Sequence, residues 1–233
     1  SHELRTPLIP ILALTELVLA GELTSEQRDY LGDVRDAARR LLAMFERLLE
    51  LVALEDYAPE SSAVALAGLR SALVEQCSSK ARERGLELGG SLGPGLPACA
   101  WLDLRLVRLA AGELCDNALR FTASGRVEVT LALAPEEERM GQRLILEVAD
   151  TGPGIAQESL AAIRTGLTQG DAPLTKRHGG LGVGMAIVGR AVELMGGELV
   201  IDSAPGSGTR MRLVLPLCPA PEEIALRTDF VCS

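Results

Sequence analysis

Apolar side chains recur at helical spacing along the N-terminal part of the chain, in two separate runs. The first run steps alternately by four and three residues, through Leu4, Leu8, Ile11, Thr15 and Val18. The second keeps such steps for longer, through Leu31, Val34, Ala38, Leu41, Phe45, Leu48 and Val52. Between the runs, residues 24–27 read Thr-Ser-Glu-Gln, which is typical of a helix N-cap and first turn. The pattern predicts a helical hairpin over residues 1–57.

The second apolar stripe is broader than a two-stranded seam requires, because Ala37, Leu42 and Leu49 widen it. Such breadth is typical of helices in a four-helix bundle. One hairpin cannot bury this stripe alone, so we expect a homodimer in which a second copy supplies two more helices. The alternative is an intramolecular bundle packed on the rest of the chain.

A linker at residues 58–62 separates the hairpin from a region that mixes strands and helices. The patterns predict a strand and helix over 63–85, a strand at 86–88, a loop at 89–97, a helix over 103–121, strands at 127–131 and 144–149, and a hairpin of 197–203 with 209–215. Strands with segregated helices predict an α+β fold, an α/β sandwich over residues 63–217. Residues 218–233 lack periodicity and are expected to form a loosely held tail.

Charge and cysteine usage exclude several classes of protein. The net charge of −9 argues against a nucleic-acid-binding protein, which would present a basic surface. The five cysteines form no C-x-x-C pair, as expected for a reduced cytoplasmic protein rather than a disulfide framework or zinc site. No signal peptide or membrane-length apolar run is present, so we expect no membrane contact within these residues. The chain begins with Ser1, and we expect a fragment of a longer protein that an upstream segment could anchor in a membrane.

The first candidate chemistry lies at the start of the chain, where His2 and Glu3 are adjacent and Thr6 follows. In a helix, positions 2 and 6 share a face. Glu3 could hydrogen-bond one imidazole nitrogen of His2 and leave the other as a nucleophile. Thr6 could hold a water over the group that His2 carries; the alternative is that Thr6 makes only local helix hydrogen bonds.

A second candidate lies in the helix predicted over 103–121. Glu113 and Asn117 are four residues apart and therefore share one face. A carboxylate and an amide oxygen are ligands that suit Mg²⁺ and its waters. Arg120, three residues after Asn117, could reach a phosphate.

A third candidate follows the strand that ends near residue 149. Asp150 could accept a hydrogen bond from an exocyclic amine, and Gly152 and Gly154 would let a flat ring approach the backbone beside Ile155.

A fourth candidate is the glycine-rich stretch before an apolar helical run at residues 177–186. Free amides at a helix N-terminus bind phosphate. The predicted contacts here are Lys176, Arg177, Gly180, Leu181, Gly182, Gly184 and Met185. Lys176 and Arg177 either contact phosphate or are simply solvated. No parallel βαβ pattern surrounds the glycines, which argues against a dinucleotide-binding fold.

Taken together and in this order, these stretches resemble the sensor histidine kinases of two-component systems. Residues 1–8 resemble that family's phosphoacceptor box, 113–121 its N box, 150–155 its first glycine box and 180–186 its second. Residues 206–209, which include Thr209, resemble its last glycine box. The resemblance implies a dimerisation and phosphotransfer hairpin followed by an ATP-binding domain of the type shared with gyrase, Hsp90 and MutL.

The resemblance also implies roles for individual residues. His2 would be phosphorylated by ATP on a ring nitrogen, and Glu3 would orient it or take its proton. Asn117 would ligate Mg²⁺ and Asp150 would bind the adenine amine. The phosphoryl group would pass to an aspartate in the receiver domain of a response regulator, and Thr6 would hold water for dephosphorylation of that partner.

Two departures from the family keep other functions open. Residues 163–169 lack the two phenylalanines common there and have Arg164 and Leu167 instead, and Arg120 replaces the usual N-box lysine. A degenerate kinase acting as an ATP-binding scaffold or phosphatase is therefore one alternative. An ATPase of the gyrase and Hsp90 class without phosphotransfer is another, against which the hairpin carrying His2 argues.

Overall fold

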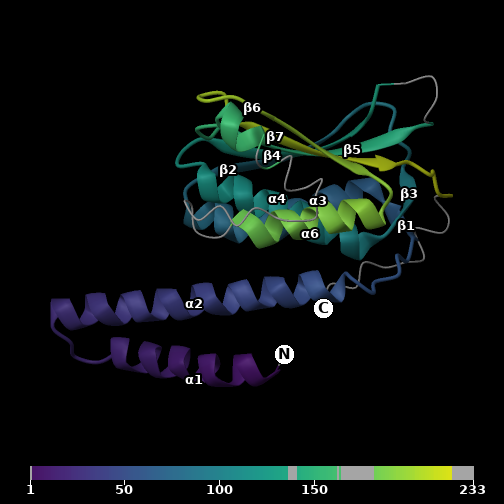
Figure 1. Ribbon diagram of the computed structural model, residues 1–233. Coiled ribbons are helices and arrows are strands. Elements are labelled where there is room, and N and C mark those ends of the chain that lie inside the picture. Colours follow the sequence, from purple (N-terminus) through teal and green to yellow (C-terminus); the bar gives the residue numbers. More distant parts are fainter. Residues whose placement is uncertain (1, 136–140, 162, 164–180, 222–233) are drawn as a thin grey trace.

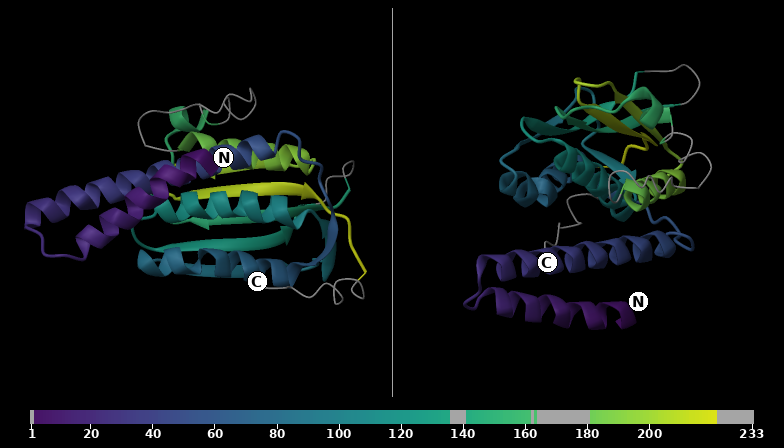
Figure 2. Two further views of the ribbon diagram at one scale, coloured as in Figure 1. Left: turned by 90° about the horizontal axis from the view of Figure 1, so that it is seen from below. Right: turned by 60° about the vertical axis from the view of Figure 1, so that its left-hand side comes forward.

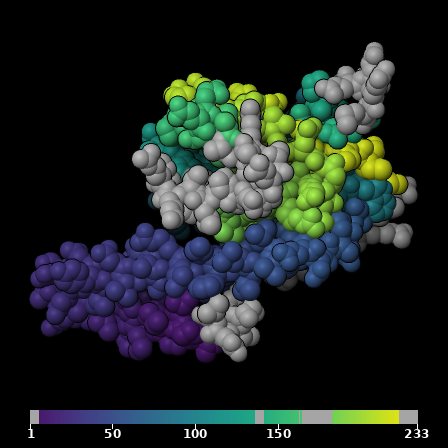
Figure 3. Space-filling view, viewed as in Figure 1, coloured from purple at the N-terminus to yellow at the C-terminus, as the bar shows by residue number. Residues whose placement is uncertain are grey.

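The chain folds into a helical hairpin that lies against a layered α/β unit (Figure 1). The structure is a computed structural model that describes residues 2–135, 141–161, 163 and 181–221, with side chains described from Thr6 onward except that of Leu181. The hairpin consists of α1 (His2–Leu19) and α2 (Ser25–Ala53). Its turn end projects beyond the α/β unit, as Figures 1 and 3 show. None of the described helices is both long enough and apolar enough to cross a membrane.

The predicted N-cap of the second helix is confirmed. The Thr24 hydroxyl accepts the Gln27 backbone N–H at 3.2 Å, and the Gln27 side chain accepts the Thr24 backbone N–H at 3.1 Å. This reciprocal capping box satisfies two donors that the first helical turn would leave unpaired. Arg28 then donates to the Leu19 carbonyl at 3.0 Å, which ties the end of α1 to the start of α2.

Much of the predicted apolar stripe stays exposed in the single chain. Leu8 and Ala38 are buried between α1 and α2, whereas Val34, Leu41 and Val52 are 48%, 44% and 60% exposed. Two antiparallel helices have too little facing surface to cover so broad a stripe.

The predicted α+β fold is confirmed. Its five-stranded sheet has the order β2-β4-β5-β7-β6, with β2 parallel to β4 and the other pairs antiparallel. The strands are β2 (Glu87–Leu92), β4 (Arg126–Leu133), β5 (Arg143–Asp150), β6 (Glu198–Ser203) and β7 (Thr209–Pro216). Three helices, α3 (Leu66–Glu83), α4 (Leu104–Phe121) and α6 (Leu181–Leu194), cover one face of the sheet (Figures 1 and 2). Val129, Leu146 and Leu213 point into this core and are fully buried.

The loop predicted at 89–97 is wrong as far as Leu92, because β2 continues through Gly89 and Gly90. Glycines weaken a strand signal in the sequence. Here the parallel pairing with β4 holds the strand, and Gly90 makes room for α3: a Cβ there would lie 2.6 Å from Cγ2 of Val74.

A small second sheet was predicted only in part from the sequence. Strand β1 (Ser62–Ala65) pairs antiparallel with β3 (Cys99–Leu102), a strand that was not predicted. The segment after Pro216, expected to be loose, is held against the free edge of β3. The Trp101 N–H donates to the Cys218 carbonyl at 2.8 Å, and the Ala220 N–H donates to the Cys99 carbonyl at 2.9 Å. Edge pairing therefore orders the chain as far as Ala220.

Candidate functional site

Helix α4 carries one half of the candidate site and is anchored at its start by Asp103. One oxygen of this buried carboxylate accepts the Leu106 backbone N–H at 2.9 Å and caps the helix. The other accepts from the Tyr57 hydroxyl at 3.0 Å and from the Glu60 N–H at 2.8 Å. Asp103 thus fixes α4 and the interdomain linker to each other.

The structure brings Glu113 and Asn117 of α4 against the start of α6. A Cβ built on Gly184 would collide with Oε2 of Glu113, so a larger residue there would have to push the carboxylate aside. The Asn117 side-chain amide donates to the Met185 sulfur at 3.4 Å. The N-box pair and the second glycine stretch therefore form one wall, although they lie far apart in the sequence.

The Glu113 carboxylate also has a cationic neighbour from outside the α/β unit. Burial raises the pKa of Glu113, and the Arg47 guanidinium on α2 opposes that rise. Arg47 Nε donates to Oε1 of Glu113 at 3.0 Å. The sequence analysis missed Arg47, which lies on the polar side of α2 with no local motif around it.

Asp150 forms the other half of the site, at the end of β5. Its Oδ1 accepts the Gly152 backbone N–H at 2.8 Å, which leaves the carboxylate with a second oxygen to offer an amine. Burial raises the pKa of Asp150, and backbone hydrogen bonds from Gly152 and Thr209 act against that rise.

Two glycines let the first and last glycine boxes pack backbone against backbone. Gly154 has φ 72° and Gly208 has φ 73°, the left-handed region that favours glycine. A Cβ on Gly154 would collide with the Ala204 carbonyl, and one on Gly208 with the Asp150 carbonyl. The two turns are therefore interlocked by close contact.

Ser203, which the sequence analysis also missed, connects these two turns. Its hydroxyl accepts the Ile155 N–H at 2.8 Å and donates to the Gly208 carbonyl at 2.9 Å. The buried Thr209 hydroxyl lies 3.0 Å from it. The position of Ser203 directly before a glycine-rich turn is the signal that could have found it.

Thr122 joins the two halves of the site. It follows the last residue of α4, and a Cβ on Gly152 would lie 3.2 Å from its hydroxyl oxygen. This hydroxyl is buried and has no hydrogen-bond partner within the described part of the chain. An orphaned hydroxyl, a half-buried carboxylate and partly exposed glycine backbone together are groups that can pair with the polar edge of a purine.

Other predicted residues are less closely gathered. The Arg120 guanidinium lies over the Phe121 ring, 5.4 Å from its centroid. Lys176, Arg177 and Gly180 lie outside the described residues, as do Arg164 and Leu167. Gly182 is buried in the first turn of α6, which begins at Leu181.

The N-terminal candidates lie on α1, away from the α/β unit. The α1 helix begins at His2, includes Glu3 and carries Thr6 on an exposed face. Figures 1 and 2 show α2 between α1 and the α/β unit. The structure therefore does not bring His2 and Asp150 together within one chain.

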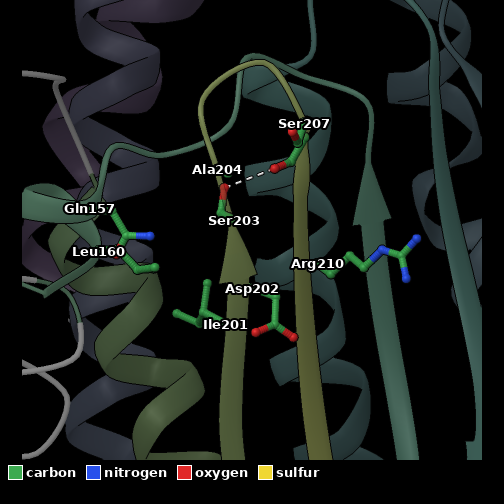
Figure 4. A pocket seen from close by; sticks show the side chains of 9 residues that line it. Gln157, Leu160, Ile201, Asp202, Ser203, Ala204, Ser207 and Arg210 are labelled. Carbon is green, nitrogen blue, oxygen red and sulfur yellow. Dashed lines mark hydrogen bonds between the residues drawn. The ribbon is translucent and has the colours of Figure 1, made fainter.

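A separate hollow of about 410 Å³ lies beside the turn between β6 and β7. Figure 4 shows Gln157 and Leu160 on one side of it and Ile201 facing them from β6. Ser203 and Gly208 also line it, whereas Asp150 and Thr122 do not. The hollow therefore borders the candidate site at the turn between β6 and β7.

Comparison with known families identifies the class to which this arrangement belongs. A model of the histidine kinase-, DNA gyrase B- and HSP90-like ATPases matches residues 102–219, and a model of the His Kinase A (phospho-acceptor) domain matches residues 1–56. The chain belongs to the histidine kinase, gyrase B and HSP90-like ATPase family, and its phospho-acceptor domain places it among the sensor histidine kinases.

The chain is also similar in sequence to curated sensor kinases. The chain is 32% identical over 225 residues to the sensor protein GacS of Pseudomonas syringae pv. syringae, covering 96% of this chain and 25% of GacS. It is 32% identical over 212 residues to the histidine-protein kinase BarA of Escherichia coli K12, covering 90% of this chain and 23% of BarA. The chain therefore spans about a quarter of these relatives' length.

Solved structures show the same fold. The crystal structure of full-length ShkA in complex with AMPPNP has a TM-score of 0.70 and 31% identity, covering 94% of this chain and 45% of that one. The Acinetobacter baumannii histidine kinase AdeS has a TM-score of 0.58 at 19% identity, covering 93% of this chain and 98% of that one.

Asp150→Asn is expected to weaken ATP binding by about 1.5–3 kcal/mol, because the amide removes a charge and replaces an acceptor with a donor. Calorimetric titration measures this directly. Asp202→Asn is the matched control, since Asp202 is an exposed carboxylate on β6 paired with Arg212. Unchanged affinity in Asp150→Asn would contradict the adenine-amine role.

The same variant should be more stable than the wild type at neutral pH. Because burial raises the pKa of Asp150, the folded protein holds this proton more tightly than the unfolded chain. Ionisation above the folded pKa therefore costs folding free energy, and that cost disappears as the pH falls below the unfolded value. Denaturant unfolding should show the two proteins converging in acid and diverging at neutral pH. A less stable variant at neutral pH would be inconsistent with the burial cost.

Proposed function

We propose that this chain is the catalytic core of a protein histidine kinase, with a phosphotransfer hairpin at residues 1–57, an ATP-binding unit at 63–217 and a tail at 218–233. The observation that carries the proposal is the set of polar groups gathered around Asp150. The orphaned Thr122 hydroxyl, the Asp150 carboxylate and the interlocked glycine turns lie beside one another at the end of α4. The AMPPNP named with the ShkA structure supports ATP as the ligand.

In this proposal the nucleotide lies along α4 with its base at Asp150. Gly152, Gly154 and Ile155 provide backbone at the base, and Thr209 supports the turn behind it. The phosphates lie toward the start of α6, whose first turn contains Leu181, Gly182 and Gly184. The next residue, Met185, contacts Asn117. Lys176, Arg177, Gly180 and Arg120 are proposed phosphate contacts, since free amides and cations suit that end of the ligand.

Glu113 and Asn117 fit Mg²⁺, because both offer hard oxygen atoms at one turn of α4. Mg²⁺ would neutralise charge on the phosphates when it is bound. Asn117 is the proposed direct ligand, and Glu113 would hold the ion through an oxygen or its waters. Magnesium usually keeps several waters and substrate oxygens, so two protein groups suffice.

The proposed reaction transfers the terminal phosphoryl group of ATP to His2. An imidazole nitrogen attacks the γ-phosphorus, the bond from that phosphorus to the β,γ-bridging oxygen breaks, and ADP leaves. Glu3 orients the ring or takes the proton that the imidazole loses. The phosphoryl group then passes to an aspartate in the receiver domain of a response regulator. Because ATP and such regulators are cytoplasmic, we place this core in the cytoplasm.

A homodimer is proposed from the uncovered apolar face of the hairpin. Val34, Leu41, Leu48 and Val52 are all more than one-third exposed along α2. A second copy of the hairpin would cover them as the other half of a four-helix bundle.

The kinase assignment predicts that label from γ-phosphate-labelled ATP enters the wild type and is absent from His2→Gln. The bond should be stable in base and labile in acid, as a phosphorus–nitrogen bond is. Glutamine removes the nucleophilic ring but keeps a polar side chain, and ATP affinity measured on both proteins is the control. ATP binding without incorporation into either protein would favour the scaffold alternative, and release of phosphate without incorporation would favour a simple ATPase.

A further inference from the structure

Arg47 on α2 forms ion pairs with two carboxylates of α4. Its Nε lies 3.0 Å from Oε1 of Glu113, and its Nη2 lies 3.2 Å from Oδ2 of Asp116. The Glu113 side chain is only 12% exposed, so this pair is much less open to solvent than an ordinary surface ion pair. Lys80 holds the other oxygen of Asp116 at 2.6 Å, which keeps that carboxylate in place from within the α/β unit.

Other contacts join α2 to the α/β unit without touching the proposed nucleotide site. Arg105 on α4 pairs with Glu50 at 2.8 Å. Arg190 on α6 donates to the carbonyls of Leu54 and Glu55, each at 3.4 Å. Of the contacts named here, the one made by Arg47 is the one that involves a residue of the proposed metal and nucleotide site, Glu113.

The position of Glu113 makes Arg47 and a bound metal compete. One oxygen of Glu113 accepts from Arg47, and the other faces Gly184 at a distance that leaves no room for a Cβ. A divalent cation at Glu113 and Asn117 would bring a second positive charge to the carboxylate that the guanidinium now holds. The Glu113 side chain is only 12% exposed, so little water screens the repulsion between the two cations.

We propose that Arg47 is a latch that docks the ATP-binding unit on α2 and that Mg·ATP must displace it from Glu113. This inference rests on the proposed function, since it takes Glu113 as part of the metal–nucleotide site. Phosphotransfer within one chain would also need this release, because α2 stands between α1 and the ATP-binding unit in the docked arrangement (Figure 1). The two equilibria are thermodynamically linked. Removing the latch must strengthen Mg·ATP binding by the same factor by which bound Mg·ATP weakens the docking of the ATP-binding unit on α2.

The test compares Arg47→Met with Arg40→Met in the whole chain. Both remove one positive charge from α2, but Arg40 donates to the Asp36 carbonyl of its own helix. Titration calorimetry with Mg·ATP should show about tenfold tighter binding for Arg47→Met than for the wild type, a typical coupling between two sites. Arg40→Met should match the wild type. With EDTA in place of magnesium, the gain should vanish, because ATP alone does not compete for the carboxylate.

The possible outcomes distinguish failure of the latch proposal from failure of the proposed function. Equal Mg·ATP affinity in all three proteins would overturn the latch and leave the proposed function standing. Weaker binding by Arg47→Met would make Arg47 a nucleotide contact and would also overturn the latch. Absence of Mg·ATP binding in every protein, Arg40→Met included, would overturn the proposed function and the latch with it.

A second measurement follows the contact itself. In Arg47→Lys, a zero-length carbodiimide should join the introduced amine to the Glu113 carboxylate, and mass spectrometry would identify the linked peptides. Mg·ATP should suppress that link while the Lys80–Asp116 link, which lies within the ATP-binding unit, persists as the internal control. A cross-link between α2 and Glu113 that survives saturating Mg·ATP would show that the metal leaves the contact in place, and the latch would be wrong.

Discussion

Gly208→Ala should destabilise the ATP-binding unit by about 3 kcal/mol or more, whereas Gly206→Ala, in the same turn, should cost only about 1–2 kcal/mol. Both glycines have positive φ, 73° and 78°. A Cβ on Gly206 meets nothing within 4 Å, but one on Gly208 would collide with the Asp150 carbonyl. Gly206→Ala therefore measures the backbone cost alone, and the difference between the variants measures the collision.

The expected loss extends to nucleotide binding, because relief of the collision must move the Asp150 backbone. Urea unfolding gives the stabilities, and ATP titration at a temperature where both variants are folded gives the affinities. Gly206→Ala should bind like the wild type, and Gly208→Ala should lose about 1.5–3 kcal/mol of binding free energy as the Asp150 hydrogen bond is misplaced. Equal stability of the two variants would mean that the two turns are not interlocked.

Thr6→Val should reduce dephosphorylation of the partner's phospho-aspartate by about 10²-fold while leaving phosphorylation of His2 intact. Thr6 follows His2 by one turn on the same face of α1. A hydroxyl can hold an attacking water in line, which a methyl group of the same shape cannot. Attack by the His2 imidazole on ATP uses no such water.

Both rates should be measured on the same protein, with the receiver domain of a response regulator as the partner and circular dichroism as a check on α1. Thr6→Ser is the matched variant, because it keeps the hydroxyl and loses only the methyl group. It should retain dephosphorylation. Equal loss of both reactions in Thr6→Val would mean that Thr6 supports the helix, and an unchanged dephosphorylation rate would place the water elsewhere.

Features encoded within a few neighbouring residues could be predicted from the sequence. The capping box at Thr24 and the start of α4 after Asp103 follow from local hydrogen bonds, and the structure contains both. The alternating strands 127–131 and 144–149 are likewise recovered within β4 and β5. The candidate residues on α4 and at Asp150 were visible for the same reason, since their chemistry and their spacing lie in short stretches.

Strand β2 and the segment near Cys218 show where local patterns fail. The strand predicted at 86–88 is the start of β2, but two glycines hide its continuation to Leu92, which is held by parallel pairing with β4. The segment from 218 to 220 has no periodicity and is ordered by pairing with the edge of β3. Both are stabilised by partners distant in sequence, and tertiary pairing outweighs weak intrinsic strand preference.

The sequence by itself determined which chemical groups this protein has and on which elements they lie: a histidine at the head of one helix, Glu113 and Asn117 on another, and Asp150 at a strand end. Only the tertiary structure decided which of them meet. The contacts of Glu113 with Gly184 and Arg47, and of Gly208 with the Asp150 backbone, join segments far apart in the chain. No local periodicity encodes such contacts, because they arise from the way that helices and turns pack once the core is buried.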